Sequence, residues 1–125
     1  MGVEGVLERR RAERMELLDR ARRFVAEVEA KIPLRAAVVF GSVARGDFNR
    51  WSDIDLLLIC DDTPGEWMRR LDMLDPIPPP VQPIVWTVAE WAIQLRRNNP
   101  IAREAVEDGV WVKGSAADLG ETLGS

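Results

Sequence analysis

Histidine is absent from this chain of 125 residues, and cysteine occurs once, at Cys60. A single cysteine forms no internal disulfide, and without histidine the common zinc sites cannot be assembled. Any bound metal is therefore expected to be a hard ion held by oxygen atoms. The chain also lacks the roughly 18 consecutive apolar residues that a membrane span requires, and its charged N-terminal residues do not fit a signal peptide. We therefore expect a cytoplasmic protein that does not contact a membrane.

Basic residues are not in excess either. The chain carries 17 Lys and Arg against 21 Asp and Glu, which gives a net charge of -4. A protein that binds nucleic acid independently of its sequence normally carries a basic surplus, so direct nucleic-acid binding is not expected. The three arginines at 9–11 are interleaved with glutamates, a pattern typical of a solvated helix face.

The length fits one domain, which we place at 1–114, followed by a disordered tail at 115–125. Apolar residues recur at steps of three and four from Met15 to Ile32, which predicts a long amphipathic helix at 4–31. Runs rich in Val, Ile and Leu between Gly or Pro residues predict strands at 36–40, 54–60, 81–87 and 110–112. Capping signals predict further helices at 64 to about 74, 87 to about 97 and 99–109. The expected fold class is α/β (α+β): a small mixed β-sheet flanked by helices, with a core at 34–114.

Two of these helix starts are predicted from capping boxes. In a capping box, the side chain of the residue before the helix accepts from the backbone N–H three residues later, and the side chain of that later residue accepts from the first backbone N–H. Thr63, Pro64 and Glu66 give the signal for the helix at 64, and Thr87 with Glu90 gives it for the helix at 87. We therefore interpret Glu90 as a structural residue rather than a catalytic acid. Pro83 cannot donate a backbone hydrogen bond, which places the strand at 81–87 near a sheet edge or a bulge.

Chemically distinctive residues lie where the first strand ends and the second begins. Gly41 has no Cβ, so a phosphate can approach its backbone, and Ser42 adds a hydroxyl group and the free N–H groups of a helical turn. Asp53 and Asp55 lie two apart on a strand, so their side chains leave one face with Cα atoms ~6.6 Å apart. Without a cation, their repulsion is of order 2–3 kcal/mol at an effective dielectric constant near 20. The pattern therefore indicates a phosphate site beside a site for a divalent metal ion.

The same pattern predicts part of the topology. Phosphate and metal can meet only if the end of the first strand lies beside the start of the second. The strands at 36–40 and 54–60 must therefore run antiparallel. Asp61 and Asp62 follow Asp53 by eight and nine residues, which along a strand is a distance of ~26 Å. They therefore cannot bind the same metal ion as Asp53.

Gly-Ser, ten intervening residues and Asp-x-Asp, flanked by "VVF" and "LLLI", closely resemble the minimal nucleotidyltransferases of the DNA polymerase β superfamily. The resemblance covers roughly 15–114, because "VQPIVWTVAEW" and "NPIAREAVEDGVWVKG" are also similar to that family's closing segments. It implies the polymerase β-like nucleotidyltransferase fold. Small members of the family commonly pair with a HEPN-domain ribonuclease as antitoxin and toxin. The implied reaction is the transfer of AMP from ATP to a tyrosine of the toxin.

The resemblance also implies roles for individual residues. Asp53 and Asp55 would bind Mg²⁺ and count as catalytic. The residues implied in nucleotide binding are Gly41, Ser42, Arg45 and Ser52.

The third acidic residue of the family is replaced here by Gln82, which we keep as the third catalytic candidate. Glutamine can offer a carbonyl oxygen to a metal, but it adds no negative charge and cannot act as a general base. Two readings follow. The chain is either an active transferase or a nucleotide-binding module that neutralises its partner by binding alone. The sequence leaves open the acceptor, the nucleotide preference, the number of metal ions, and whether the protein forms a homo- or hetero-oligomer.

Overall fold

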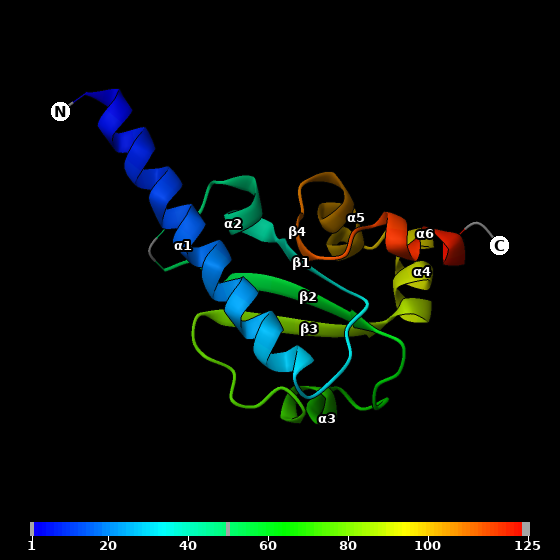
Figure 1. Ribbon diagram of the computed structural model, residues 1–125. Helices are drawn as coiled ribbons and strands as arrows, with labels where there is room; N and C mark the ends of the chain where they lie inside the picture. The colour runs from blue at the N-terminus through cyan, green and yellow to red at the C-terminus, as the bar shows by residue number, and fades with distance from the viewer. Residues whose placement is uncertain (1, 50, 124–125) are drawn as a thin grey trace.

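The computed structural model describes residues 2–49 and 51–123, which form a four-stranded sheet with helices on both faces (Figure 1). The strands are β1 (Ala36–Phe40), β2 (Ile54–Cys60), β3 (Val81–Thr87) and β4 (Val110–Lys113). The helices are α1 (Val3–Glu29), α2 (Gly41–Arg45), α3 (Trp67–Asp72), α4 (Val88–Arg96), α5 (Pro100–Glu107) and α6 (Ala117–Leu123). The strand order is β3-β2-β1-β4, with β2 and β3 parallel and the other neighbours antiparallel. The expected class, a small mixed sheet flanked by helices, is confirmed.

The sheet separates two hydrophobic cores. Side chains of a strand alternate between its faces, so β1 and β2 contribute to both cores. One core lies under α1 and includes Leu18, Phe24, Val25, Val39, Leu56 and Leu58. The other lies under α4, α5 and α6 and includes Val38, Leu57, Ile59, Trp91, Ala105 and Leu119. Because both faces of β2 are covered, charged side chains are accommodated only near its ends.

Helix α1 crosses one face of the sheet, and its N-terminal turns extend beyond it (Figure 1). Two arginines fasten the middle of α1 to the short helix α2. Arg14 donates to the carbonyl oxygens of Val43 at 2.9 Å and Ala44 at 2.7 Å, and Arg10 donates to that of Gly46 at 3.0 Å. These bonds satisfy carbonyl groups at the end of α2 that have no partner within the helix. The long N-terminal helix therefore helps to fix the segment that follows β1.

The strand predictions are accurate because local signals bound each strand. Strands β1, β2 and β3 have the predicted limits, and β4 extends one residue further, to Lys113. Pro83 lies on β3, which is an edge strand as expected. The capping box that starts α4 is confirmed, since the Thr87 hydroxyl accepts from the Glu90 N–H and the Glu90 carboxylate accepts from the Thr87 N–H.

The predicted helix start at Thr63 is wrong. Helix α3 begins at Trp67, with Glu66 at its N-cap and no side-chain cap bond. Arg70 holds the segment before Trp67 as a loop, because its guanidinium group donates to the Pro64 carbonyl oxygen while it is also bound to Val85 and Glu90, which lie further along the chain. The hydroxyl group of Thr63 is buried without a hydrogen-bond partner.

The expected disordered tail differs from the structure over its described part. Residues Ala117–Leu123 form α6, and Leu119 is fully buried in the core beneath α4 and α5. The side chain of Asp118 also accepts from the Ser115 N–H at 2.8 Å, which caps the start of the helix. Residues 124–125 of the predicted tail lie outside the described residues. Within the described part of the chain, no helix is long and apolar enough to span a lipid bilayer.

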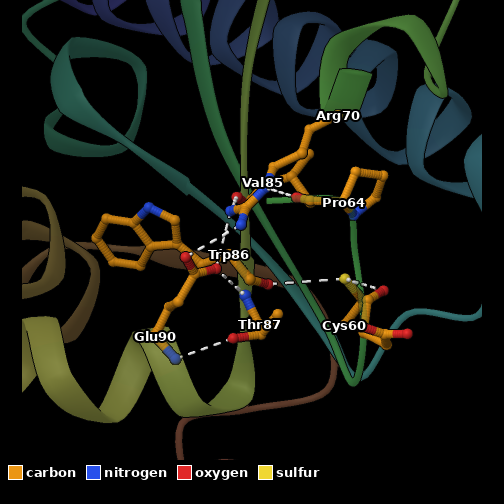
Figure 2. A network of polar contacts seen from close by, with 8 residues as sticks. Cys60, Pro64, Arg70, Val85, Trp86, Thr87 and Glu90 are labelled. Carbon is orange, nitrogen blue, oxygen red and sulfur yellow. Dashed lines mark hydrogen bonds and ion pairs between the residues drawn. The ribbon is translucent and has the colours of Figure 1, made fainter. Parts of the chain in front are cut away.

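A buried arginine links α3 to β3 and α4 (Figure 2). The side chain of Arg70 is 8% exposed and donates to the Val85 carbonyl oxygen at 2.8 Å. It also binds both carboxylate oxygens of Glu90, at 2.8 and 3.1 Å. Desolvation of Glu90 favours its neutral form, but hydrogen bonds from Arg70 and Thr87 outweigh it and lower the pKa of Glu90. Glu90 is therefore structural, as the sequence indicates.

Replacing Glu90 tests this network. Glu90→Ala leaves the buried Arg70 guanidinium without its carboxylate, and we expect the free energy of unfolding to fall by about 2 kcal/mol, less than for a fully buried pair. The carboxylate is 37% exposed, which moderates the loss. Urea denaturation measures the change. The exposed Glu66–Arg69 pair is the control, and Glu66→Ala should change stability by less than about 0.5 kcal/mol.

The contribution of Glu90 to the stability of the fold depends on pH, and the direction of this dependence is defined. The folded pKa of Glu90 lies below its ordinary value of 4.5, so its contribution to stability is complete above that pH and lost as the pH falls below it. Glu90→Gln should remove this part of the acid sensitivity. An unchanged acid-unfolding curve for Glu90→Gln would contradict the role given to the ion pair.

Candidate active site

The two strands that carry the predicted site lie side by side and run antiparallel, as the sequence predicts. Phe40, the last residue of β1, pairs with Asp55 near the start of β2. Gly41 and Ser42 follow directly, and Asp53 comes just before β2. The backbone pairing therefore brings the Gly-Ser and Asp-x-Asp segments to the same end of the sheet.

Gly41 is in close contact with Asp55. Its φ angle of +74° lies in the left-handed region that favours glycine. A Cβ atom at this position would lie 2.3 Å from Oδ2 of Asp55, which is too close for any side chain. The carboxylate of Asp55 thus lies directly against the backbone of residue 41. Glycine is required here both for the turn and for this approach.

The charge on Asp55 is not balanced by the protein. Asp55 is half-buried, and this desolvation raises its pKa above the ordinary value of 3.8. The negative charges of Asp53 and Glu104 raise it further, while Arg45 opposes them with a smaller effect. Asp53 itself is exposed. The arrangement therefore disfavours the charged form of Asp55 unless a cation joins the site.

Ser42 lies in the first turn of α2 and is half-buried. Its carbonyl oxygen accepts from the N–H groups of Gly46 at 2.8 Å and Asp47 at 3.1 Å. Gly46 has a φ angle of +92° and closes the helix in the left-handed conformation. The helical turn expected at Ser42 is thus present, and it begins one residue earlier, at Gly41.

Arg45, the predicted phosphate ligand, is engaged by carboxylates. Its Nε donates to Asp47 at 3.2 Å, and its Nη1 contacts Glu104 of α5. The hydrogen bond that Arg45 donates to Asp47 is the main cause of the raised pKa of Arg45. A phosphate group would therefore have to compete with these carboxylates for the guanidinium.

Ser52 is held in a local turn before β2. Its hydroxyl accepts from the Asn49 N–H at 2.9 Å, and its own N–H donates to the Asn49 carbonyl oxygen at 3.0 Å. It lines a pocket of about 290 Å³ between this turn and α1. The turn orients the segment that directly precedes Asp53. The assignment of Ser52 to nucleotide binding stays a prediction.

Gln82 occupies the position expected for a third acidic residue. In the parallel pair of β2 and β3 it lies in register with Asp55. Registered neighbours lie about 4.8 Å apart and share one face of the sheet.

Among the described residues, no group of three or more His, Cys, Asp or Glu is placed to hold a metal ion. The groups that could bind a metal ion at this end of the sheet are the carboxylates of Asp53 and Asp55 and the amide oxygen of Gln82. Oxygen ligands of this kind fit Mg²⁺, which needs few protein ligands when phosphates and water supply the rest.

Glu104 is a site residue that the sequence did not reveal. It lies on α5, contacts Arg45, and contributes to the raised pKa of Asp55. It is 59 residues from Arg45 in the chain. The sequence around it predicts only a helix that begins at Asn99 and Pro100, so no local signal marked it.

Comparison with known proteins agrees with this geometry. A profile of the nucleotidyltransferase domain family matches residues 21–108, and the chain belongs to that family. A crystal structure from Sulfolobus solfataricus, described as a "putative nucleotidyltransferase", is similar with a TM-score of 0.61 and 28% identity. The similarity covers 82% of this chain and 84% of that one. No curated protein sequence matches significantly. The nucleotidyltransferase fold is therefore confirmed, and family membership supports nucleotidyl transfer as the general activity.

Replacing Gly41 tests the close approach of β1 and β2. Gly41→Ala should lower the free energy of unfolding by about 3 kcal/mol, because backbone strain adds to the contact with Asp55. Gly46→Ala is the matched control, since its φ is also positive but nothing lies within 4 Å of the added Cβ. It should lose only about 1–2 kcal/mol. Equal losses in urea denaturation would show that Asp55 does not crowd residue 41.

Replacing Asp55 tests the unbalanced charge. A raised folded pKa means that the carboxylate destabilises the metal-free fold at neutral pH and has no effect below pH 3.8, its ordinary pKa. We therefore expect Asp55→Asn to raise the melting temperature at pH 7 without metal, and the gain to vanish as the pH approaches 3.8. Asp61→Asn, at the exposed far end of β2, is the control and should give no such gain. A lower melting temperature for Asp55→Asn at pH 7 would refute the interpretation.

Proposed function

We propose that this chain transfers a nucleoside monophosphate, AMP from ATP, to a hydroxyl group of a partner protein. We further propose that it acts as the antitoxin of a HEPN-domain ribonuclease. The observation that carries the proposal is the junction of β1 and β2, where the Asp55 carboxylate lies against the Gly41 backbone. Family membership supports nucleotidyl transfer in general. The acceptor and the partner rest on the resemblance of the Gly-Ser and Asp-x-Asp segments to the minimal nucleotidyltransferases.

Each residue of the site would have a separate role in the reaction. The missing side chain of Gly41 admits the Asp55 carboxylate beside the backbone, so that metal and triphosphate would meet at this residue, and Ser42 offers its hydroxyl to the triphosphate as a donor. Asp53 and Asp55 would hold Mg²⁺, which when bound neutralises phosphate charge and aligns the reacting groups. The acceptor oxygen forms a bond to the α-phosphorus, and the bond to the bridging oxygen of pyrophosphate breaks. The hydroxyl proton passes to water, because Gln82 has no basic group to accept it.

A second candidate is a nucleotide-binding module that neutralises its partner by binding, without chemistry. Gln82 favours this candidate, because it lies in register with Asp55 where a third carboxylate is expected. The ligand set then contains no group that can act as a general base. The two candidates differ in whether a covalent adduct forms.

The deciding assay mixes the protein with ATP labelled at the α-phosphate, Mg²⁺ and a HEPN-domain toxin. We expect the toxin to be labelled, and Asp53→Asn or Asp55→Asn to reduce the rate by more than about 100-fold. Asp61→Asn keeps the same change of charge away from the site and should label normally. Gln82→Glu should label faster, because it adds the missing base. Toxin inhibition without any adduct, in both wild type and Gln82→Glu, would reject the transferase and support the binding module.

A further inference from the structure

Helix α2 carries Ser42 and is too short to be stable by itself. It has five residues, and helices of this length are marginal in water without contacts from elsewhere in the molecule. Burial of Val43 and Ala44 in the core under α1 holds one side of it. The helix ends at Gly46, and its last carbonyl groups need donors from outside the helix. The order of α2 therefore depends on side chains that are distant in the sequence.

Those donors come from the part of α1 that precedes Leu18, the first buried residue of that helix. Figure 1 shows α2 beside this part of α1. The guanidinium group of Arg14 bonds two successive carbonyl oxygens, that of Val43 through Nε at 2.9 Å and that of Ala44 through Nη2 at 2.7 Å. A positive charge at the C-terminal end of a helix is also favourable, because it complements the helix dipole. One side chain therefore stabilises the end of α2 by both hydrogen bonds and charge.

Arg10 makes a second attachment, one turn earlier in α1. It donates to the carbonyl oxygen of Gly46 at 3.0 Å. Its guanidinium group also lies over the ring of Phe48, 4.1 Å from the ring centre, where the ring face attracts a cation. Phe48 is itself buried, and the chain continues from it to Asp53. Helix α1 therefore holds the segment between Ser42 and Asp53 at two places.

We propose that Arg14 is a positioning residue of the nucleotide site, which acts through α2 by holding the Ser42 hydroxyl group where it meets the triphosphate. The inference rests on the proposed function, because that function places the triphosphate at Ser42. Arg14 need not touch the nucleotide, since its guanidinium group is bonded to the backbone of α2. A shift of about 1 Å in a group that orients a substrate can cost about 100-fold in rate, even when the altered residue is remote.

The test compares Arg14→Met with Arg20→Met in the full chain. Methionine keeps a long unbranched side chain and removes the hydrogen-bond donors. Arg20 is the matched control, because it lies on the same helix and bonds Glu16 at an exposed position. Calorimetric titration measures the binding of a non-hydrolysable ATP analogue with Mg²⁺. We expect Arg14→Met to weaken binding about tenfold and Arg20→Met to bind as wild type. Arg14→Lys keeps the charge and can bond one carbonyl oxygen, so it should recover part of the affinity.

A second measurement separates positioning from a general loss of stability. The N–H groups of Gly46 and Asp47 both donate to the Ser42 carbonyl oxygen, so their hydrogen exchange reports the order of α2. We expect exchange at these two amides to be about tenfold faster in Arg14→Met. Val28→Ala is the control for stability, because it removes buried packing near the other end of α1. It should lower the melting temperature and leave the nucleotide affinity unchanged.

The outcomes separate this inference from the proposed function. Unchanged exchange in Arg14→Met, or faster exchange with unchanged nucleotide affinity, would overturn the inference, because Arg14 would then contribute to the fold alone. An equal loss of affinity in Val28→Ala would overturn it as well. If Arg14→Met does not fold, Arg14→Lys replaces it in both measurements. Failure of the wild type to bind the analogue with Mg²⁺ would reject the proposed function, and the inference with it, whatever the exchange rates show.

Discussion

The antiparallel pairing of β1 and β2 is the constraint on which the rest of the site depends. It places Asp55 opposite Phe40 and so against the backbone of Gly41. The pairing is stabilised because β1 and β2 bury apolar side chains on both faces of the sheet, with Leu56 and Leu58 in one core and Leu57 and Ile59 in the other. The hydrophobic cores therefore fix the position of a charged group that is itself unfavourable there. Stability of the fold and strain at the site come from the same register.

The parts of the structure that followed from sequence are those set by neighbouring residues. Apolar runs bounded by glycine or proline located the strands, and Thr87 with Glu90 located the start of α4. Local signals failed where a distant contact decides. The start of α3 depends on the contacts of Arg70 with Val85 and Glu90, and α6 depends on burial of Leu119 beneath α4 and α5.

The same distinction between local signals and distant contacts applies to the residues of the candidate site. The Gly-Ser and Asp-x-Asp segments and their antiparallel strands could be predicted because the spacing and the apolar flanks lie within one short stretch. Glu104 could not, because it reaches Arg45 from α5, far along the chain. Nor could the hydrogen bonds from Arg14 to α2, because the carbonyl oxygens that accept them lie on a different helix. The substitution at Gln82 was visible in the sequence, and the register with Asp55 gives it a location.

We propose that Asp53 and Asp55 hold a divalent cation together with a nucleotide bound at Gly41 and Ser42. The most direct measurement follows the backbone amide signals of the ¹⁵N-labelled protein while a non-hydrolysable ATP analogue is added, with and without Mg²⁺. We expect the signals of Gly41 and Ser42 to shift only when Mg²⁺ is present, and Asp55→Asn to abolish the shift. Equal shifts without the metal, or shifts confined to residues away from this end of the sheet, would contradict it.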